Sequence, residues 1–90
     1  DPKHRDYYLA AVYYLNEGQD LKQAKKWINK AIAMKDDAYW YFRQQSLILA
    51  GLNETAAAIE AAKNSLELAK KAGNQDYIKL NTESIAEWSK

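Results

Sequence analysis

Apolar side chains recur along the chain at helical spacing, and turn-forming residues divide this pattern into five segments. The pattern predicts helices over about residues 2–17, 21–34, 56–72 and 75–88. A further helix is expected to start at Asp36-Asp37 and to end near Gly51. The linkers are only a few residues long, so consecutive helices should form antiparallel hairpins. We therefore expect an all-α fold.

The expected helix boundaries carry recognisable capping residues. Asp1 and Asp20 are suited to cap the first and second helices, because a carboxylate accepts hydrogen bonds from free backbone N–H groups. Gly18 suits the left-handed residue that ends the first helix. Gly73-Asn74 should end the fourth helix and cap the fifth, and Asn53 should occupy the turn before the fourth.

The sequence repeats after 34 residues. Residues of similar size coincide at this shift: Ala24 with Ala58, Ile32 with Leu66, Met34 with Leu68, Tyr8 with Phe42 and Leu15 with Leu49. One period contains two helices, so the repeating unit is a helical hairpin.

The residues within each hairpin resemble the tetratricopeptide repeat (TPR) family. In the second helix of that motif, a small residue is followed four positions on by a larger one and seven positions on by another small one. The corresponding residues here are Ala24-Ile28-Ala31 and Ala58-Ala62-Ser65. The first helix has an aromatic residue, a small one and a large one, as in Tyr7-Ala11-Tyr14 and Phe42-Ser46-Leu49. The resemblance implies an α-α superhelix in a single domain, 1–90. Its repeats would cover about 2–35 and 36–72, followed by a capping helix at about 75–88.

Several positions depart from the family pattern. The first turn is one residue longer than usual, Asp36 replaces the usual proline, and Asn53 replaces the usual turn glycine. The chain is also similar to the repeat-containing C-terminal part of an uncharacterised bacterial protein family. The Ala56-Ala57-Ala58 run and the absence of an initiator Met would equally suit an engineered variant.

The resemblance implies a peptide-binding surface, since TPR domains bind extended peptides on the concave side formed by their first helices. The corresponding residues here are Arg5, Tyr8, Val12, Asn16, Trp40, Arg43 and Leu47. Chaperone-binding members clamp a carboxylate with Lys and Asn, but Tyr8 and Val12 stand at those positions. The clamp is therefore absent, and the expected partner is a different peptide, another domain or a second copy of the chain.

Aromatic residues at 39–42 occupy four successive positions and must point to different sides of one helix. Phe42 is expected in the core, and one of Trp40 and Tyr41 at the surface. Trp40 and Arg43 are the best candidates for exposed anchors, because Trp and Arg are enriched at binding hot spots. Trp88 is expected to anchor the last helix.

Composition narrows the possible functions. Thirteen basic and twelve acidic residues give a net charge of +1, which argues against nucleic acid or an anionic membrane as the main partner. Cysteine is absent, and His4 is the only histidine, so no metal site or cofactor is expected. His4 is expected to be a solvated helix residue. No catalytic motif is present, which predicts that the chain is not an enzyme.

Two functional interpretations remain open. The first is a soluble binding or assembly scaffold that docks a partner through the aromatic first-helix face. The second is a purely structural or engineered repeat domain with no ligand. The start of the chain is polar and lacks a signal peptide, so the cytoplasm is the default location.

Overall fold

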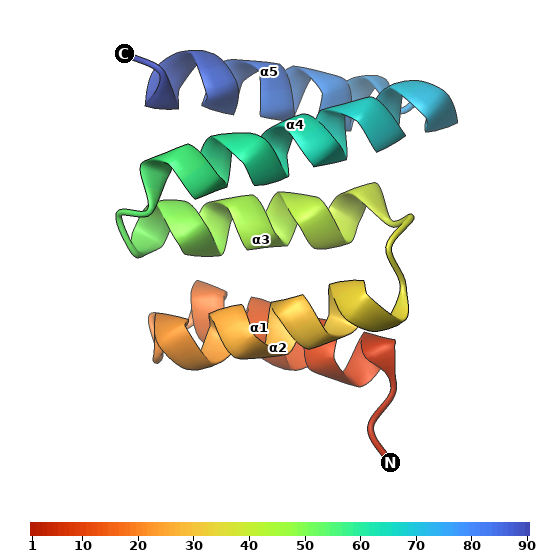
Figure 1. Ribbon diagram of the computed structural model, residues 1–90, viewed down its shortest axis with the longest axis vertical. Coiled ribbons are helices and arrows are strands. Elements are labelled where there is room, and N and C mark those ends of the chain that lie inside the picture. Colours follow the sequence, from red (N-terminus) through yellow and green to blue (C-terminus); the bar gives the residue numbers. More distant parts are fainter.

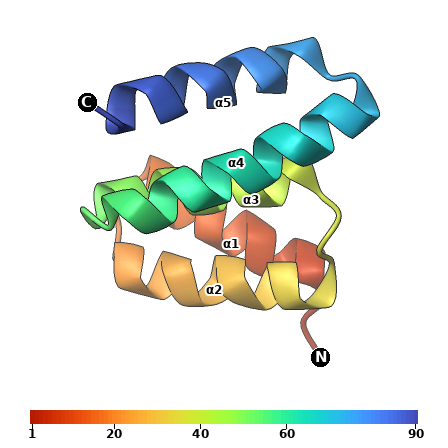
Figure 2. The ribbon, with the colours of Figure 1, turned by 45° about the horizontal axis from the view of Figure 1, so that its top comes forward.

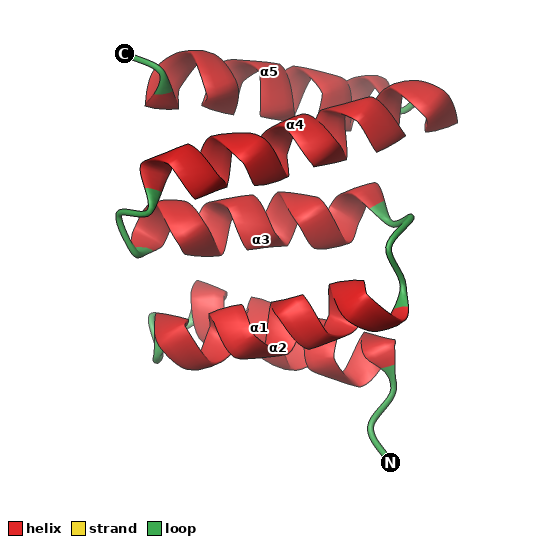
Figure 3. Cartoon of the chain, viewed as in Figure 1, coloured by secondary structure: helices red, strands yellow, loops and turns green.

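Five α-helices make up the protein, and the computed structural model describes all residues 1–90 (Figure 1). They are α1 (His4–Asn16), α2 (Leu21–Met34), α3 (Tyr39–Gly51), α4 (Thr55–Ala72) and α5 (Gln75–Trp88). The remaining residues form loops and turns, with no strand (Figure 3). The predicted all-α fold is confirmed.

The helices are arranged as successive hairpins along the longest dimension of the molecule, which measures 35 × 27 × 19 Å. The hairpin of α1 and α2 lies at one end, α3 and α4 lie in the middle, and α5 lies at the other end (Figures 1 and 2). Helix α3 packs on both α2 and α4, and α5 packs on α4. Each hairpin therefore covers the apolar face of the next.

Two of the expected caps are present. The Asp20 carboxylate accepts hydrogen bonds from the backbone N–H groups of Lys22 and Gln23, at 2.9 and 3.3 Å. Asn74 Oδ1 accepts from the backbone N–H of Tyr77 at 3.0 Å. These bonds satisfy donors that the first helical turn leaves without partners, and so they fix where α2 and α5 begin.

Two other expected helix starts were wrong. Helix α1 begins at His4 instead of residue 2, and the Asp6 carboxylate, not Asp1, accepts a hydrogen bond from the Lys3 N–H at 2.8 Å. Helix α3 begins at Tyr39, so Asp36-Asp37 lie in the linker. There, Asp37 forms an ion pair with Lys35 at 2.8 Å instead of capping a helix.

The turn before α4 takes the left-handed backbone that its asparagine favours. Asn53 has φ 62°, and it is the only residue other than glycine with a positive φ. Asparagine tolerates this region better than most residues because its short polar side chain bonds locally. The proposed substitution of asparagine for a turn glycine is therefore sterically consistent.

Burial follows the sequence repeat. The paired second-helix residues of α2 and α4, which are 34 positions apart, are all completely buried: Ala24 with Ala58, Ile28 with Ala62, and Ala31 with Ser65. In the first helices the equivalent spacing is 35, and Ala11, Ser46 and Asn81 are all completely buried. The two periods differ because the first turn, 17–20, is one residue longer than the second, 52–54.

The third member of this series shows that α5 occupies the place of another first helix. Asn81 stands 35 residues after Ser46 and is equally buried, whereas Leu80 beside it is 42% exposed. Trp88, the expected anchor of α5, is half-buried against a cluster that contains Leu49, Ala58 and Ala61. Helix α5 thus covers the end of the second hairpin.

Buried polar groups connect the last three helices. Asn81 Nδ2 donates to Ser65 Oγ at 2.8 Å, and Ser65 in turn donates to the backbone carbonyl of Tyr39 at 2.7 Å. Asn81 Oδ1 accepts a longer bond, 3.4 Å, from Arg43. Because buried polar groups are costly without partners, this chain of bonds specifies how α5 sits on α3 and α4.

Replacing Asn81 with alanine should destabilise the fold. The Asn81→Ala variant removes one of the two hydrogen-bond partners of Ser65 and leaves a cavity, so we expect a loss of about 1–3 kcal/mol in the free energy of unfolding. Urea denaturation followed by circular dichroism measures this loss. Thr82→Ala on the exposed side of α5 is the control, and equal effects of the two substitutions would contradict the assigned network.

Candidate functional site

The predicted site residues lie on α1 and α3, on a surface that we call the first-helix face. Two of them, Arg5 and Asn16, are exposed. The others are half-buried: Tyr8, Val12, Trp40, Arg43 and Leu47. Helices α1 and α3 are in contact, and α5 also contacts α3. The structure therefore brings the predicted residues onto adjacent helices, with α5 as an additional neighbour.

Tyr41 organises the aromatic side chains of this region. Its ring stacks on the Tyr8 ring with centroids 4.6 Å apart, and the Trp40 ring meets it edge-on at 5.9 Å. Trp40 also meets Tyr39 edge-on at 4.8 Å. Such offset and edge-to-face pairs hold the rings in defined orientations. Trp40 is thus a half-buried member of a packed cluster, not the freely exposed anchor that we expected.

The expected core position of Phe42 was wrong. Tyr41 is the buried member of the aromatic run, within a cluster that also contains Ala31 and Ala38. Phe42 is half-buried and lines a shallow hollow of about 350 Å³ with Asn64 and Leu68. Helix α3 is covered on two sides, by α2 and by α4, so an apolar stripe does not identify which ring faces inward.

His4 has a structural partner and is not the solvated side chain that we expected. Its Nδ1 atom lies 2.6 Å from the Tyr41 hydroxyl, and the ring is half-buried. This hydrogen bond gives the buried Tyr41 hydroxyl a partner and ties the start of α1 to α3. His4 therefore contributes to the position of the Tyr41 ring.

Arg43 joins α3 to α5. Its guanidinium Nη1 donates to Ser84 Oγ at 2.9 Å, with longer contacts of 3.4 Å to Asn81 Oδ1 and to the Leu80 carbonyl. Burial lowers the pKa of Arg43 from its ordinary value, and the nearby Tyr77 acts in the opposite direction. Arg43 is consequently held by the fold, in contrast to the exposed anchor that we expected.

Tyr77 on α5 also belongs to this region, although it is not among the residues predicted from the sequence. Its ring meets the Tyr39 ring edge-on at 4.8 Å. Burial, and then the neighbouring phenols of Tyr77 and Tyr41, raise the pKa of Tyr8. These relations place α5 near the predicted face. Its spacing in the sequence could have identified it, because Tyr77 lies 35 residues after Phe42, and this interval separates equivalent positions of the first helices.

Gln44 is the second residue that the sequence analysis missed. It stands four positions after Trp40 and three before Leu47, so it shares their side of α3. Its Oε1 atom is buried and has no hydrogen-bond partner. A buried acceptor without a partner destabilises a fold by about 1–3 kcal/mol, so Gln44 lowers the stability of the fold as long as no donor reaches its oxygen.

Other kinds of site have little support in the geometry. Three or more His, Asp or Glu side chains do not converge anywhere in a way that could hold a metal ion. None of the five helices combines the length and apolar character that crossing a bilayer requires. Neither of the two surface hollows includes Tyr8, Trp40 or Arg43, so the first-helix face is a shallow surface.

Comparisons with protein-family models, curated proteins and solved structures find no match to this chain. The TPR assignment therefore stays a prediction that rests on residue spacing and on the repeating burial. The fold defines a class of protein, the small all-α chain of stacked helical hairpins.

The tyrosine cluster should make the stability sensitive to alkaline pH. Burial raises the pKa of both Tyr8 and Tyr41 above the ordinary value, so the folded state retains these protons longer than the unfolded state. The stability that this pKa difference contributes is fully present below about pH 10, and it is lost as the pH rises above that value. Urea denaturation at a series of pH values measures this decline.

The Tyr8→Phe variant isolates that effect, because it keeps the stacked ring and removes the hydroxyl. It should decline less steeply than the unmodified chain above about pH 10. Tyr13→Phe, at a tyrosine that is 61% exposed, is the matched control and should leave the slope unchanged. Identical slopes for all three proteins would show that Tyr8 does not ionise differently in the folded state.

Proposed function

We propose that this protein is an interaction module that binds a peptide, another domain or a second copy of itself through the first-helix face. The observation that carries the proposal is the unpartnered, buried Gln44 acceptor on the side of α3 that also carries the half-buried Trp40. Gln44 as a residue is only half-buried, so a rotation of its side chain would bring this oxygen within reach of a backbone N–H donor of an extended peptide.

The surrounding side chains suit this role. Tyr8 and Trp40 provide aromatic area in orientations already held by ring packing, which lowers the entropy lost on binding. Arg5 and Asn16 are exposed at the two ends of α1 and can contact polar groups of a partner. Since the face is shallow, an extended or flat partner fits better than a small molecule.

A variant at Gln44 should separate stability from binding. Gln44→Met has nearly the same volume and removes the unpartnered oxygen, so the free energy of unfolding should stay equal or rise by about 1 kcal/mol. Peptide binding should weaken at the same time, because the donor of the peptide backbone loses its acceptor. Thermal denaturation and fluorescence anisotropy with peptides selected from a displayed library measure the two effects.

Two controls decide the outcome. Gln45→Met removes a hydrogen bond to Asn29 (3.0 Å) and should lower stability without affecting the selected peptides. Tyr13→Ala removes an exposed ring from α1 and should leave both properties nearly unchanged. Peptides that bind Gln44→Met as tightly as the unmodified chain would contradict the proposal. So would a chain that selects no peptide and remains monomeric at every concentration in light scattering.

A further inference from the structure

A second surface differs in charge from the rest of the molecule. Helix α2 carries four lysines and no acidic residue, whereas the other residues of the chain carry nine basic and twelve acidic side chains. The near-neutral net charge is therefore the sum of one basic helix, α2, and an acidic remainder of the chain. Lys22, Lys25, Lys26 and Asn29 recur at helical spacing and share one side of α2.

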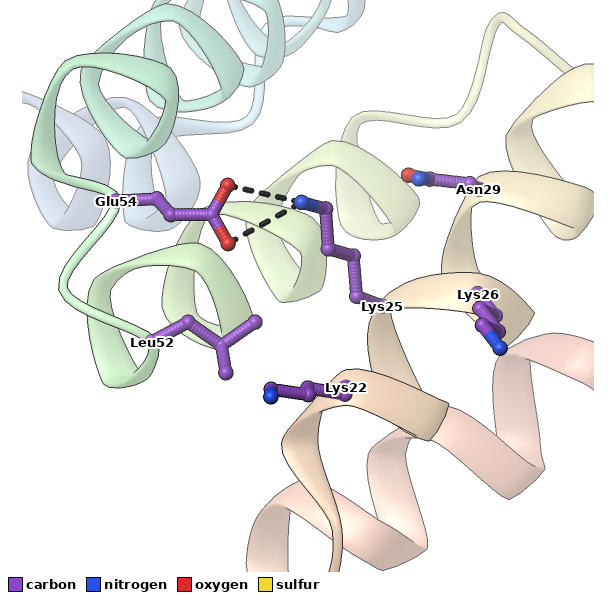
Figure 4. A pocket seen from close by; sticks show the side chains of 6 residues that line it. All are labelled: Lys22, Lys25, Lys26, Asn29, Leu52 and Glu54. Carbon is purple, nitrogen blue, oxygen red and sulfur yellow. Dashed lines mark hydrogen bonds and ion pairs between the residues drawn. The ribbon is translucent and has the colours of Figure 1, made fainter.

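These residues line a hollow of about 400 Å³ between α2 and the turn that leads into α4. Lys22, Lys25 and Asn29 extend from α2 toward Leu52 and Glu54 on the opposite side (Figure 4). Leu52 is the only apolar residue of the lining, so the hollow has one hydrophobic wall and several cationic groups. It does not involve the residues of the first-helix face.

A carboxylate of the protein already lies within the hollow. Both Glu54 oxygens accept hydrogen bonds from Lys25 Nζ, at 2.8 and 3.1 Å (Figure 4). Lys22 and Lys26 form no ion pair within the protein. With one acid against three lysines, the hollow keeps two unmatched positive charges. Glu54 thus places one carboxylate against one of the three lysines.

We propose that this hollow binds an acidic segment of a partner protein, whose carboxylates contact Lys22 and Lys26 and displace Glu54 from Lys25. Leu52 would contact the aliphatic part of the incoming side chain. A surface ion pair contributes only about 0–1 kcal/mol, so an external carboxylate can replace Glu54 at little cost.

The lining favours an acidic peptide over nucleic acid. No aromatic ring lines the hollow, so bases would have no platform for stacking. No arginine lines it either, and arginine is the residue that matches phosphate in a bidentate manner. A long polyanion would also extend beyond α2 toward a remainder of the chain in which acidic residues outnumber basic ones.

Fluorescence anisotropy with a labelled peptide of glutamate and alanine tests the proposal, with the matched glutamine–alanine peptide as reference. We expect binding of the glutamate peptide only, and weaker binding as salt rises. The triple variant Lys22→Gln/Lys25→Gln/Lys26→Gln should bind roughly tenfold more weakly, since three modest charge contacts are lost. Glu54→Gln should bind about threefold more tightly, because the internal competitor is removed.

The triple variant Lys63→Gln/Lys70→Gln/Lys71→Gln on α4 makes the same change in net charge away from the hollow, and it should retain nearly all binding. Equal losses in the two triple variants would overturn the proposal, since binding would then follow net charge alone. Unchanged affinity in Glu54→Gln would also overturn it, as would tighter binding of short duplex DNA or of phosphatidylserine vesicles. Gln44→Met should leave this binding unchanged, which keeps the test separate from that of the first-helix face.

Discussion

Close approach of helices at small, completely buried residues is the constraint on which the structure depends. Ala11 and Ser46 hold equivalent positions in α1 and α3, and Ala24 and Ala58 do so in α2 and α4. Helix axes can approach closely only where the side chains between them are small. Each hairpin presents such residues to its neighbours, so the same contact is used repeatedly along the stack.

This repeated contact also determines where larger and polar side chains can lie. Because Ala31 and Ala38 occupy little space, the Tyr41 ring fits between the hairpins and supports Tyr8 and Trp40. At the other end of the stack, Asn81 takes the small-residue position and bonds to Ser65. The first-helix face and the basic hollow on α2 are therefore separate surfaces of one fold.

Much of the backbone could be predicted from the sequence, because helix period and capping act locally. The bounds of α2 and α5 and the caps at Asp20 and Asn74 agree with prediction. The local sequence predicted the wrong residue where two nearby aspartates could each bond to the start of a helix. Asp1 was expected to cap α1, but Asp6 bonds to the Lys3 N–H.

The candidate site was less predictable, because its details depend on contacts between distant segments. A stripe pattern cannot choose between Tyr41 and Phe42 on a helix covered from two sides. The bonds of Arg43 require knowledge that Ser84 lies opposite, 41 residues further along the chain. The unpartnered Gln44 oxygen is likewise a property of the packed structure and has no signature in composition or spacing.

The neighbouring residues Ala57 and Ala58 allow the most direct test of the central claim, since Ala57 is exposed and Ala58 is completely buried. Urea denaturation should show that Ala58→Leu lowers the free energy of unfolding by about 1–3 kcal/mol, because the added methylenes force α3 and α4 apart. Ala57→Leu should change it by less than about 0.5 kcal/mol. Equal, small effects of the two substitutions would contradict the view that close helix approach holds this fold together.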